Sequence, residues 1–221
     1  AHGKQCNLVG EIQHHSKVFS LLGKPGQLKE LCGKLVQYGM EHVEIALGER
    51  LSYPEERILR GYPADFLETE HDPLAVVLCK NEKPISRVTH GMPDEAFLRE
   101  KAPMTKEEIR EVSICKLHLG RDSIIYDVGA GSGSLSVEMA QVSYEGKVYA
   151  VEKNPDAVEL LQKNRCRFGV DNLEIIEGYA PEALEHLPTP THVFIGGSSG
   201  NLKEICMLCL LYTSPSPRDM R

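Results

Sequence analysis

The stretch Asp127-Val-Gly129-Ala-Gly131-Ser-Gly133 decides the fold, because it follows a β-branched run and precedes a helical pattern. Glycines at such a turn let the backbone approach a ligand, and the N-terminus of the following helix offers free N–H groups. A dinucleotide-binding fingerprint has its third glycine three residues after the second, whereas Gly133 comes only two residues after Gly131. The stretch therefore predicts a nucleotide-type site of another kind, with an ordinary tight turn as the alternative.

Around this stretch, short apolar runs alternate with helical patterns. Strands are expected at residues 123–126, 147–151, 173–176 and 192–195, and helices at residues 135–142, 156–168 and 181–187. Such alternation predicts an α/β fold whose parallel sheet is covered by helices on both faces. Thr105 and Glu108 form a capping-box pattern, which predicts that a further helix opens this domain.

The residues before Pro103 lack this regular alternation. Apolar spacing predicts a helix between Pro25 and Gly39, and two strands are expected at residues 42–47 and 74–79. The second strand is nearly all apolar, so we expect both of its faces to be buried. Prolines, glycines and charges without a clear period then predict a linker. The expected parts are a domain at residues 1–80, a linker at 81–102 and a domain at 103–208.

Both ends of the chain differ from an ordinary domain. The chain starts with Ala1, and residues 1–10 show no period, so we expect it to begin inside a larger reading frame. Residues 209–221 resemble the translation of a sequencing adapter, with a Ser/Pro-rich tail as the alternative. Pro215 and Pro217 are expected to end any helix before them. Four strands of the α/β domain are therefore expected before this tail.

Charge and composition exclude several classes of protein. The 221-residue chain has 25 Lys and Arg against 32 Asp and Glu, a net charge of −7, which argues against a nucleic-acid binder. The apolar runs at residues 74–79 and 207–212 are far shorter than the ~20 residues that cross a bilayer, so no membrane contact is expected. Seven scattered cysteines and the absence of a signal-peptide pattern indicate a reducing cytoplasm. No His or Cys grouping has the spacing of a metal site.

Two further segments are expected at the sheet edge that carries the glycine stretch. Glu152 ends a strand, where an acidic side chain can accept both hydroxyls of a ribose; a surface Glu paired with Lys153 is the alternative. The fourth strand leads into Gly196-Gly-Ser-Ser-Gly-Asn201 at the edge where open α/β sheets bind ligands. That loop leaves room for a bulky substrate, with a plain flexible turn as the alternative.

Residues 127–133 resemble the first motif of Rossmann-like, class I S-adenosylmethionine methyltransferases. The resemblance implies S-adenosylmethionine as cofactor and an adenine contact after the third strand, where many relatives carry an acidic residue in place of Tyr179. The residues that the resemblance implies in cofactor binding are Asp127, Gly129, Ala130, Gly131, Ser132, Gly133, Glu152, Tyr179 and Ala180.

The second part of the chain resembles the precorrin C15-methyltransferase (C12-decarboxylating) domain of the cobalamin pathway. The segments that carry this resemblance are residues 103–110, 127–133, 149–155, 180–184 and 194–201. Residues 2–4, 39, 48–58 and 74–79 resemble the carboxyl half of precorrin C5-methyltransferases, which are tetrapyrrole methylases. In this order the two parts resemble the fused bifunctional precorrin-6Y C5,15-methyltransferases (decarboxylating).

This resemblance implies methylation of a precorrin, a tetrapyrrole, at C5 and C15 with decarboxylation of its C12 acetate. The implied fold is a Rossmann-like methyltransferase domain, truncated after about four strands, preceded by a partial tetrapyrrole methylase domain. Thr105 lies in the family's first-helix motif and is expected to touch the cofactor. The expected substrate-binding residues are Lys106, Arg110, Gly196, Gly197, Ser198, Asn201 and Lys203. For the three basic residues, the alternative is a solvated surface charge.

Two other functions fit the same motifs. A methyltransferase for another acceptor, such as a protein or an RNA, has the same fold and cofactor motif. A truncated fragment that binds the cofactor without catalysis fits them as well. No His or Cys is an obvious nucleophile, so no catalytic residue is assigned, and the sequence leaves a homo-oligomer open.

Overall fold

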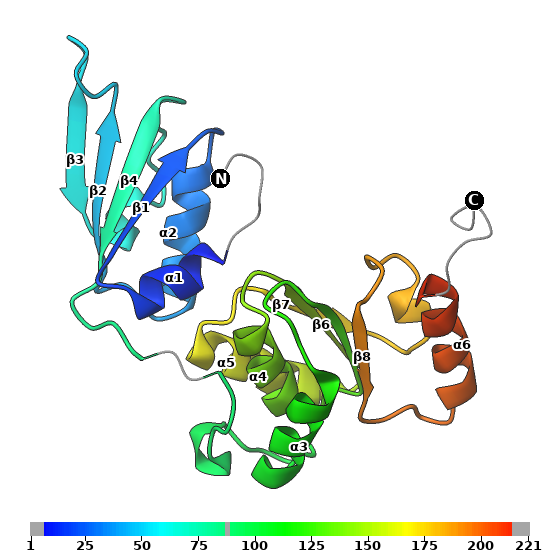
Figure 1. The fold of residues 1–221 in the computed structure, drawn as a ribbon. Helices are drawn as coiled ribbons and strands as arrows, with labels where there is room; N and C mark the ends of the chain where they lie inside the picture. The colour runs from blue at the N-terminus through cyan, green and yellow to red at the C-terminus, as the bar shows by residue number, and fades with distance from the viewer. Residues whose placement is uncertain (1–6, 87–88, 214–221) are drawn as a thin grey trace. The chain divides into compact units, whose positions relative to one another are not determined.

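A computed structural model describes residues 7–86 and 89–213. These residues form two compact units that divide between residues 87 and 88, and each unit contains one four-stranded sheet (Figure 1). No helix of the described part is long and apolar enough to cross a membrane. The sequence resemblance at residues 2–4 and the two prolines at 215 and 217 lie outside the described residues.

The first unit is an antiparallel sheet in the order β1-β4-β2-β3, with two helices beside it (Figure 1). Helix α2 matches the predicted helix, and its side chains at Leu28, Leu31 and Leu35 are buried. Strands β2 and β4 match the two predicted strands. The elements are α1 (Leu8–His14), β1 (Lys17–Leu22), α2 (Gln27–Gln37), β2 (Glu44–Glu49), β3 (Arg57–Gly61), η1 (Pro63–Phe66) and β4 (Ala75–Lys80).

The prediction that both faces of strand β4 are buried is wrong. Val77 and Cys79 are buried, but Leu78 between them is 37% exposed. Successive side chains of a strand point to opposite faces, so one face of this antiparallel sheet is packed and the other is partly open. An all-apolar strand therefore does not by itself reveal that a face is covered.

The second unit is a parallel sheet in the order β7-β6-β5-β8. All four of its predicted strands are present, and the predicted parallel α/β arrangement is confirmed. The predicted helix at 181–187 is shorter than expected and forms a single 3₁₀ turn, η3. The elements are η2 (Asp94–Ala96), α3 (Glu107–Leu117), β5 (Ile124–Val128), α4 (Ser134–Val142), β6 (Lys147–Glu152), α5 (Pro155–Phe168), β7 (Leu173–Glu177), η3 (Glu182–Leu184), β8 (His192–Ile195) and α6 (Leu202–Thr213).

Alternate side chains of the central strands build two cores, one on each face of this sheet. Ile125 and Val148 pack in a cluster with residues of α4 and α5. Their neighbours Tyr126 and Tyr149 point the other way, into a cluster with residues of η3 and α6. Figure 1 shows α4 and α5 on one side of the sheet and α6 on the other. Covering both faces explains why these strands are short runs of mainly apolar residues.

Three boundaries differ from the sequence predictions. Helix α3 begins at Glu107 and its N-cap is Lys106, so the predicted capping box at Thr105 is wrong; the Thr105 carbonyl instead accepts a bond from Arg110. The predicted linker at 81–102 ends too late, because Met92 and Phe97 are buried in the core of the second unit. Helix α6 continues to Thr213, past the predicted start of the tail at residue 209.

The strand order places the glycine stretch at the point where the sheet changes direction. The chain runs from β5 outward through β6 to β7, and then returns to place β8 on the other side of β5. In open α/β sheets, ligands bind outside the carboxyl ends of the strands at such a switch point. The glycine stretch leaves β5 at this position.

Candidate functional site

The glycine loop, residues 129–133, is packed tightly against backbone on two sides. A Cβ added to Gly129 would lie 2.6 Å from the carbonyl oxygen of Gly197 in the loop after β8. A Cβ added to Gly131 would lie 2.7 Å from the carbonyl oxygen of Pro103. Both glycines also have positive φ, at 77° and 56°. No side chain fits at either position, so glycine is required for the loop to pass between its neighbours.

Glu152 ends strand β6 and reaches back to the glycine loop. One carboxylate oxygen, Oε2, accepts the Gly131 N–H at 2.9 Å, and the other, Oε1, accepts the N–H groups of Lys153 and Asn154 at 2.9 Å each. The residue is 9% exposed. The structure therefore brings the predicted ribose-binding carboxylate next to the predicted loop, and the expected alternative of a Glu152–Lys153 side-chain pair does not form.

Asp127 lies beneath the glycine loop and is 1% exposed. Its Oδ2 accepts a hydrogen bond from the hydroxyl of Ser136 in α4. Burial raises the pKa of Asp127 to about 6, with a further increase from the Glu152 charge, while the Ser136 bond works against this. Asp127 was expected to bind the cofactor, but its side chain faces the interior, so in this structure it supports the loop from below.

The segment after β7 borders a hollow near the predicted adenine position. Tyr179 is 60% exposed, and the Nζ of Lys153 lies 5.0 Å from the centre of its ring. Ala180 is buried, and its carbonyl accepts the Asn201 amide at 3.2 Å. The residues that line the hollow are Glu177, Gly178, Tyr179, Glu182, Ala183 and Asn201. The structure thus places Tyr179, Ala180 and Asn201 together.

The loop after β8 also reaches the glycine loop. The N–H groups of Gly196 and Gly197 both donate to the Val128 carbonyl, at 2.9 and 3.2 Å. Both glycines are exposed, and Ser198, which directly follows Gly197, is half-buried, as is Asn201. Lys203 is exposed on the first turn of α6. The predicted substrate residues at 196–201 therefore lie beside the predicted cofactor loop.

The segment before α3 also borders the glycine loop. The Pro103 carbonyl accepts the Ser132 N–H at 3.2 Å, and Thr105 follows two residues later. Lys106 is 62% exposed in its side chain, and its Nζ lies 3.2 Å from Asp94.

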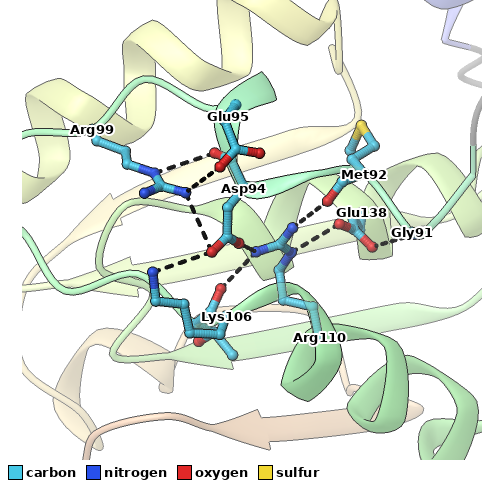
Figure 2. Close-up of polar contacts among 9 residues, drawn as sticks. Gly91, Met92, Asp94, Glu95, Arg99, Lys106, Arg110 and Glu138 are labelled. Carbon is cyan, nitrogen blue, oxygen red and sulfur yellow. Dashed lines mark hydrogen bonds and ion pairs between the residues drawn. The ribbon is translucent and has the colours of Figure 1, made fainter.

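Arg110 was expected to bind a substrate carboxylate, but it is 0% exposed. Figure 2 shows its guanidinium enclosed by acceptors: Nε donates to Glu138 at 2.9 Å and Nη1 donates to Asp94 at 2.7 Å. Burial works to lower the pKa of Arg110, but its bonds to Asp94 and Glu138 outweigh this and raise the pKa. The expectation is wrong for this structure, because the N–H groups of the guanidinium already donate to the protein's own carboxylates.

One buried group in the site lacks a partner. The Ser132 hydroxyl, in the middle of the glycine loop, has no hydrogen-bond partner among the described residues, although Ser132 is 1% exposed. Buried polar groups in proteins are usually hydrogen-bonded. A loop that requires glycine at positions 129 and 131, an adjacent carboxylate and an unpartnered hydroxyl together fit a polar ligand such as a nucleoside cofactor.

The sequence predictions missed two sets of contacts at this site. Lys153 Nζ donates to the Ser199 hydroxyl at 2.7 Å and so joins the ends of β6 and β8. Glu138 is completely buried in α4 and pairs with Arg110. A Glu within the otherwise uncharged helix at 135–142 is the sequence signal for a buried partner, but no spacing rule identifies Arg110 as that partner.

Comparison with known proteins gives consistent similarities. A family model described as "Precorrin methyltransferase domain" matches residues 95–216. The probable cobalt-precorrin-6B C(15)-methyltransferase (decarboxylating) of Sulfurisphaera tokodaii is 49% identical over 120 residues, which are 53% of this chain and 62% of that protein. The cobalt-precorrin-6B C(15)-methyltransferase (decarboxylating) of Salmonella typhimurium is 42% identical over 128 residues, 58% of this chain and 66% of that protein. The chain thus spans a little over three fifths of the length of these curated relatives.

Two solved structures share the fold. The precorrin-6y C5,15-methyltransferase of Geobacter metallireducens is 38% identical with a TM-score of 0.54, over 56% of this chain and 66% of that one. The precorrin 8w decarboxylase of Methanobacterium thermoautotrophicum is 34% identical with a TM-score of 0.52, over 55% of this chain and 66% of that one. Together with the parallel sheet, these structures confirm the predicted α/β fold of methyltransferase type.

Proposed function

The chain belongs to the precorrin methyltransferase family, and on that basis we propose that it methylates C15 of a precorrin and decarboxylates the C12 acetate in cobalamin biosynthesis. The proposed methyl donor is S-adenosylmethionine. One observation carries the proposal: the Glu152 carboxylate accepts the Gly131 N–H at 2.9 Å. This contact joins an acidic strand end to a glycine loop at the switch point of a parallel sheet, where a ribose and its neighbouring groups bind in such folds.

The chain's own groups supply binding and orientation. S-adenosylmethionine, when bound, supplies an electrophilic methyl group. Glu152 would accept hydrogen bonds from the ribose hydroxyls, and the glycine loop would let its backbone approach the rest of the cofactor. Ser132 Oγ offers a hydrogen bond from within the loop. Tyr179 and Ala180 would border the adenine, and Thr105, two residues after the Pro103 carbonyl that contacts the loop, would lie near the cofactor.

The substrate side of the proposed site is the loop after β8. Gly196 and Gly197 are exposed beside the glycine loop and carry no side chains, so a flat macrocycle can approach there. Ser198 and Asn201 supply polar groups, and Lys106 and Lys203 supply positive charge for the carboxylates of the macrocycle. Transfer to an electron-rich carbon depends mainly on alignment, which can supply a large part of the acceleration.

We extend the proposal to C5 methylation by a protein that contains the first unit. What supports this extension is the sequence of residues 48–58, which resembles tetrapyrrole methylases, and the order of the two units along the chain. The Geobacter relative carries both activities in its name.

The test is a transfer assay with the full chain, ¹³C-methyl S-adenosylmethionine and a precorrin substrate. The proposal expects the label at C15 of the product together with carbon dioxide from the C12 acetate. Label at C5 as well would support the extension. A folded chain that binds the cofactor but transfers its methyl group only to a protein or an RNA would overturn the precorrin assignment. Binding of the cofactor without any methyl transfer would support the alternative of a fragment that binds the cofactor without catalysis.

A further inference from the structure

We propose that Arg110 is a positioning residue that closes residues 92–105 into a strap and thereby holds the glycine loop in place. The proposal rests on the proposed function, because it concerns the same cofactor loop. It assigns to Arg110 a role at the site that does not require contact with either substrate or cofactor. "The strap" below means residues 92–105.

A single guanidinium joins the two ends of the strap. Nη2 of Arg110 donates to the carbonyl of Met92, and Nη1 donates to the carbonyl of Thr105 at 2.6 Å. Nη1 also donates to Asp94 at 2.7 Å. Figure 2 shows these contacts converging on the Arg110 head group. Because the planar guanidinium has five N–H donors in a fixed arrangement, it can fix two backbone carbonyls and two carboxylates at once, which a lysine cannot do.

The Arg110 guanidinium is anchored to helix α4, which covers one face of the sheet. Nε of Arg110 donates to Glu138, which is also 0% exposed, and the other Glu138 oxygen accepts the Gly91 N–H at 3.1 Å. The guanidinium also lies 4.8 Å from the ring centre of Phe97, which is buried in the strap. The strap is therefore tied to the core of the second unit by charge as well as by apolar packing.

The strap holds the glycine loop through both the backbone N–H and the backbone carbonyl of Ser132. The Ser132 N–H donates to the Pro103 carbonyl at 3.2 Å. The Ser132 carbonyl accepts the side-chain amide of Asn164 at 2.9 Å, and the Asn164 oxygen accepts the Leu98 N–H of the strap at 2.9 Å. A Cβ added to Gly131, the preceding residue of the loop, would lie 2.7 Å from the same Pro103 carbonyl oxygen. Moving the strap must therefore move Ser132 and Gly131.

The test uses the Arg110→Lys variant of the full chain, which keeps a positive charge beside Glu138 but cannot hold both strap ends. The matched control is Arg121→Lys, since Arg121 makes a surface ion pair with Glu145 at 3.3 Å and its side chain is 69% exposed. Two quantities are measured: amide hydrogen exchange by NMR and the affinity for S-adenosylhomocysteine by calorimetry.

Hydrogen exchange separates a positioning role from a general loss of stability. The reference is the Val148 amide, which donates to the backbone carbonyl of Asn172 at 3.0 Å in the core of the same unit. The proposal expects protection of the Ser132 amide to fall at least tenfold in Arg110→Lys while protection of the Val148 amide stays unchanged. It also expects at least a tenfold loss of S-adenosylhomocysteine affinity in this variant and no change in Arg121→Lys.

Equal losses of protection at Ser132 and Val148, or unchanged Ser132 protection and affinity in a folded variant, would overturn the proposal. If Arg110→Lys does not fold, the pair Arg110→Met with Glu138→Gln replaces it, because that pair removes both buried charges while Gln still accepts the Gly91 N–H. The same exchange and affinity criteria apply to that pair. A wild-type chain that does not bind S-adenosylhomocysteine would overturn the proposed function and the cofactor role of the strap together, whereas normal wild-type binding with an unaffected variant would overturn the strap alone.

Discussion

On one side of the glycine loop the Glu152 carboxylate accepts the Gly131 N–H, whereas on the other side the Pro103 carbonyl accepts the N–H of the next residue, Ser132. The two supports differ in kind. In the proposed site the ribose hydroxyls would donate to these same carboxylate oxygens, so the ligand would compete for them. The carbonyl belongs to a strap that is fixed from behind by Arg110. Under the proposed function, one support of the glycine loop would therefore exchange with the ligand and the other would not.

Removing the positive charge of Arg110 should have the largest effect on stability. Arg110→Met leaves the buried Glu138 carboxylate without its ion-pair partner, and breaking such a pair typically costs about 3–5 kcal/mol. We expect a loss of this size in the free energy of unfolding, measured by urea denaturation. Arg121→Met breaks an exposed pair and should cost less than about 1 kcal/mol. Equal losses in the two variants would contradict the account.

The buried carboxyl beneath the loop should make stability depend on pH. Asp127 keeps its proton up to a pKa of about 6 in the folded chain, against an ordinary value of 3.8. Between these values the folded state binds more protons than the unfolded state, so this contribution to stability is present below about pH 4 and is lost as the pH rises to about 6.

The measurement is the difference in unfolding free energy between the wild type and Asp127→Asn from pH 4 to pH 7. We expect the wild type to lose about 2–3 kcal/mol relative to the variant by pH 6 and nothing more above it. A difference that stays constant, or grows in favour of the wild type as the pH rises, would show that Asp127 ionises normally.

A methyl group at the contact with the strap should weaken cofactor binding. Gly131→Ala places a Cβ 2.7 Å from the Pro103 carbonyl oxygen at a φ of 56°. Because backbone cannot yield as a side-chain tip can, we expect at least a tenfold loss of S-adenosylhomocysteine affinity, about 1.4 kcal/mol. Gly33→Ala in α2, where an added Cβ meets nothing within 4 Å, is the control and should bind normally. Normal binding by Gly131→Ala would mean that the strap contact is loose.

A smaller effect is expected when the Glu152 carboxylate is replaced by a neutral amide. Glu152→Gln keeps one oxygen as an acceptor for a backbone N–H but loses the second, and a neutral hydrogen bond is weaker than a charged one by about 1 kcal/mol. We expect roughly a fivefold loss of S-adenosylhomocysteine affinity by calorimetry. A loss as large as that from Glu152→Ala would indicate that the charge alone matters.

The sequence predicts the second unit better than the first. Strands β5 to β8 are mainly apolar runs between helices, and their pattern is local, so it is visible without knowledge of the fold. Strand β3 was missed because Arg57 and Arg60 interrupt its apolar residues at an edge of the sheet. Helix α6 was missed because its second half lies where the sequence resembles an adapter. The open face of β4 could not be predicted, since its sequence is apolar on both faces.

Within the site, the sequence predicts what is local and misses what is not. Glu152 is the last residue of its strand, so its position beside the glycine loop follows from the βαβ pattern. Arg110 and Glu138 are 28 residues apart, and their pairing depends on how α3 packs on α4. A lone arginine in an exposed helical pattern gives no sign that it is buried, and this is why the expectation of substrate binding was wrong.

The central claim is that the glycine loop and Glu152 form one cofactor site. Its most direct test is calorimetric titration of S-adenosylhomocysteine into the full chain, the Glu152→Ala variant and the surface variant Glu145→Ala. The account predicts micromolar binding to the wild type and to Glu145→Ala, about −8 kcal/mol, and at least a tenfold weaker affinity for Glu152→Ala. Equal affinities for all three folded proteins, or no binding by the wild type, would contradict it.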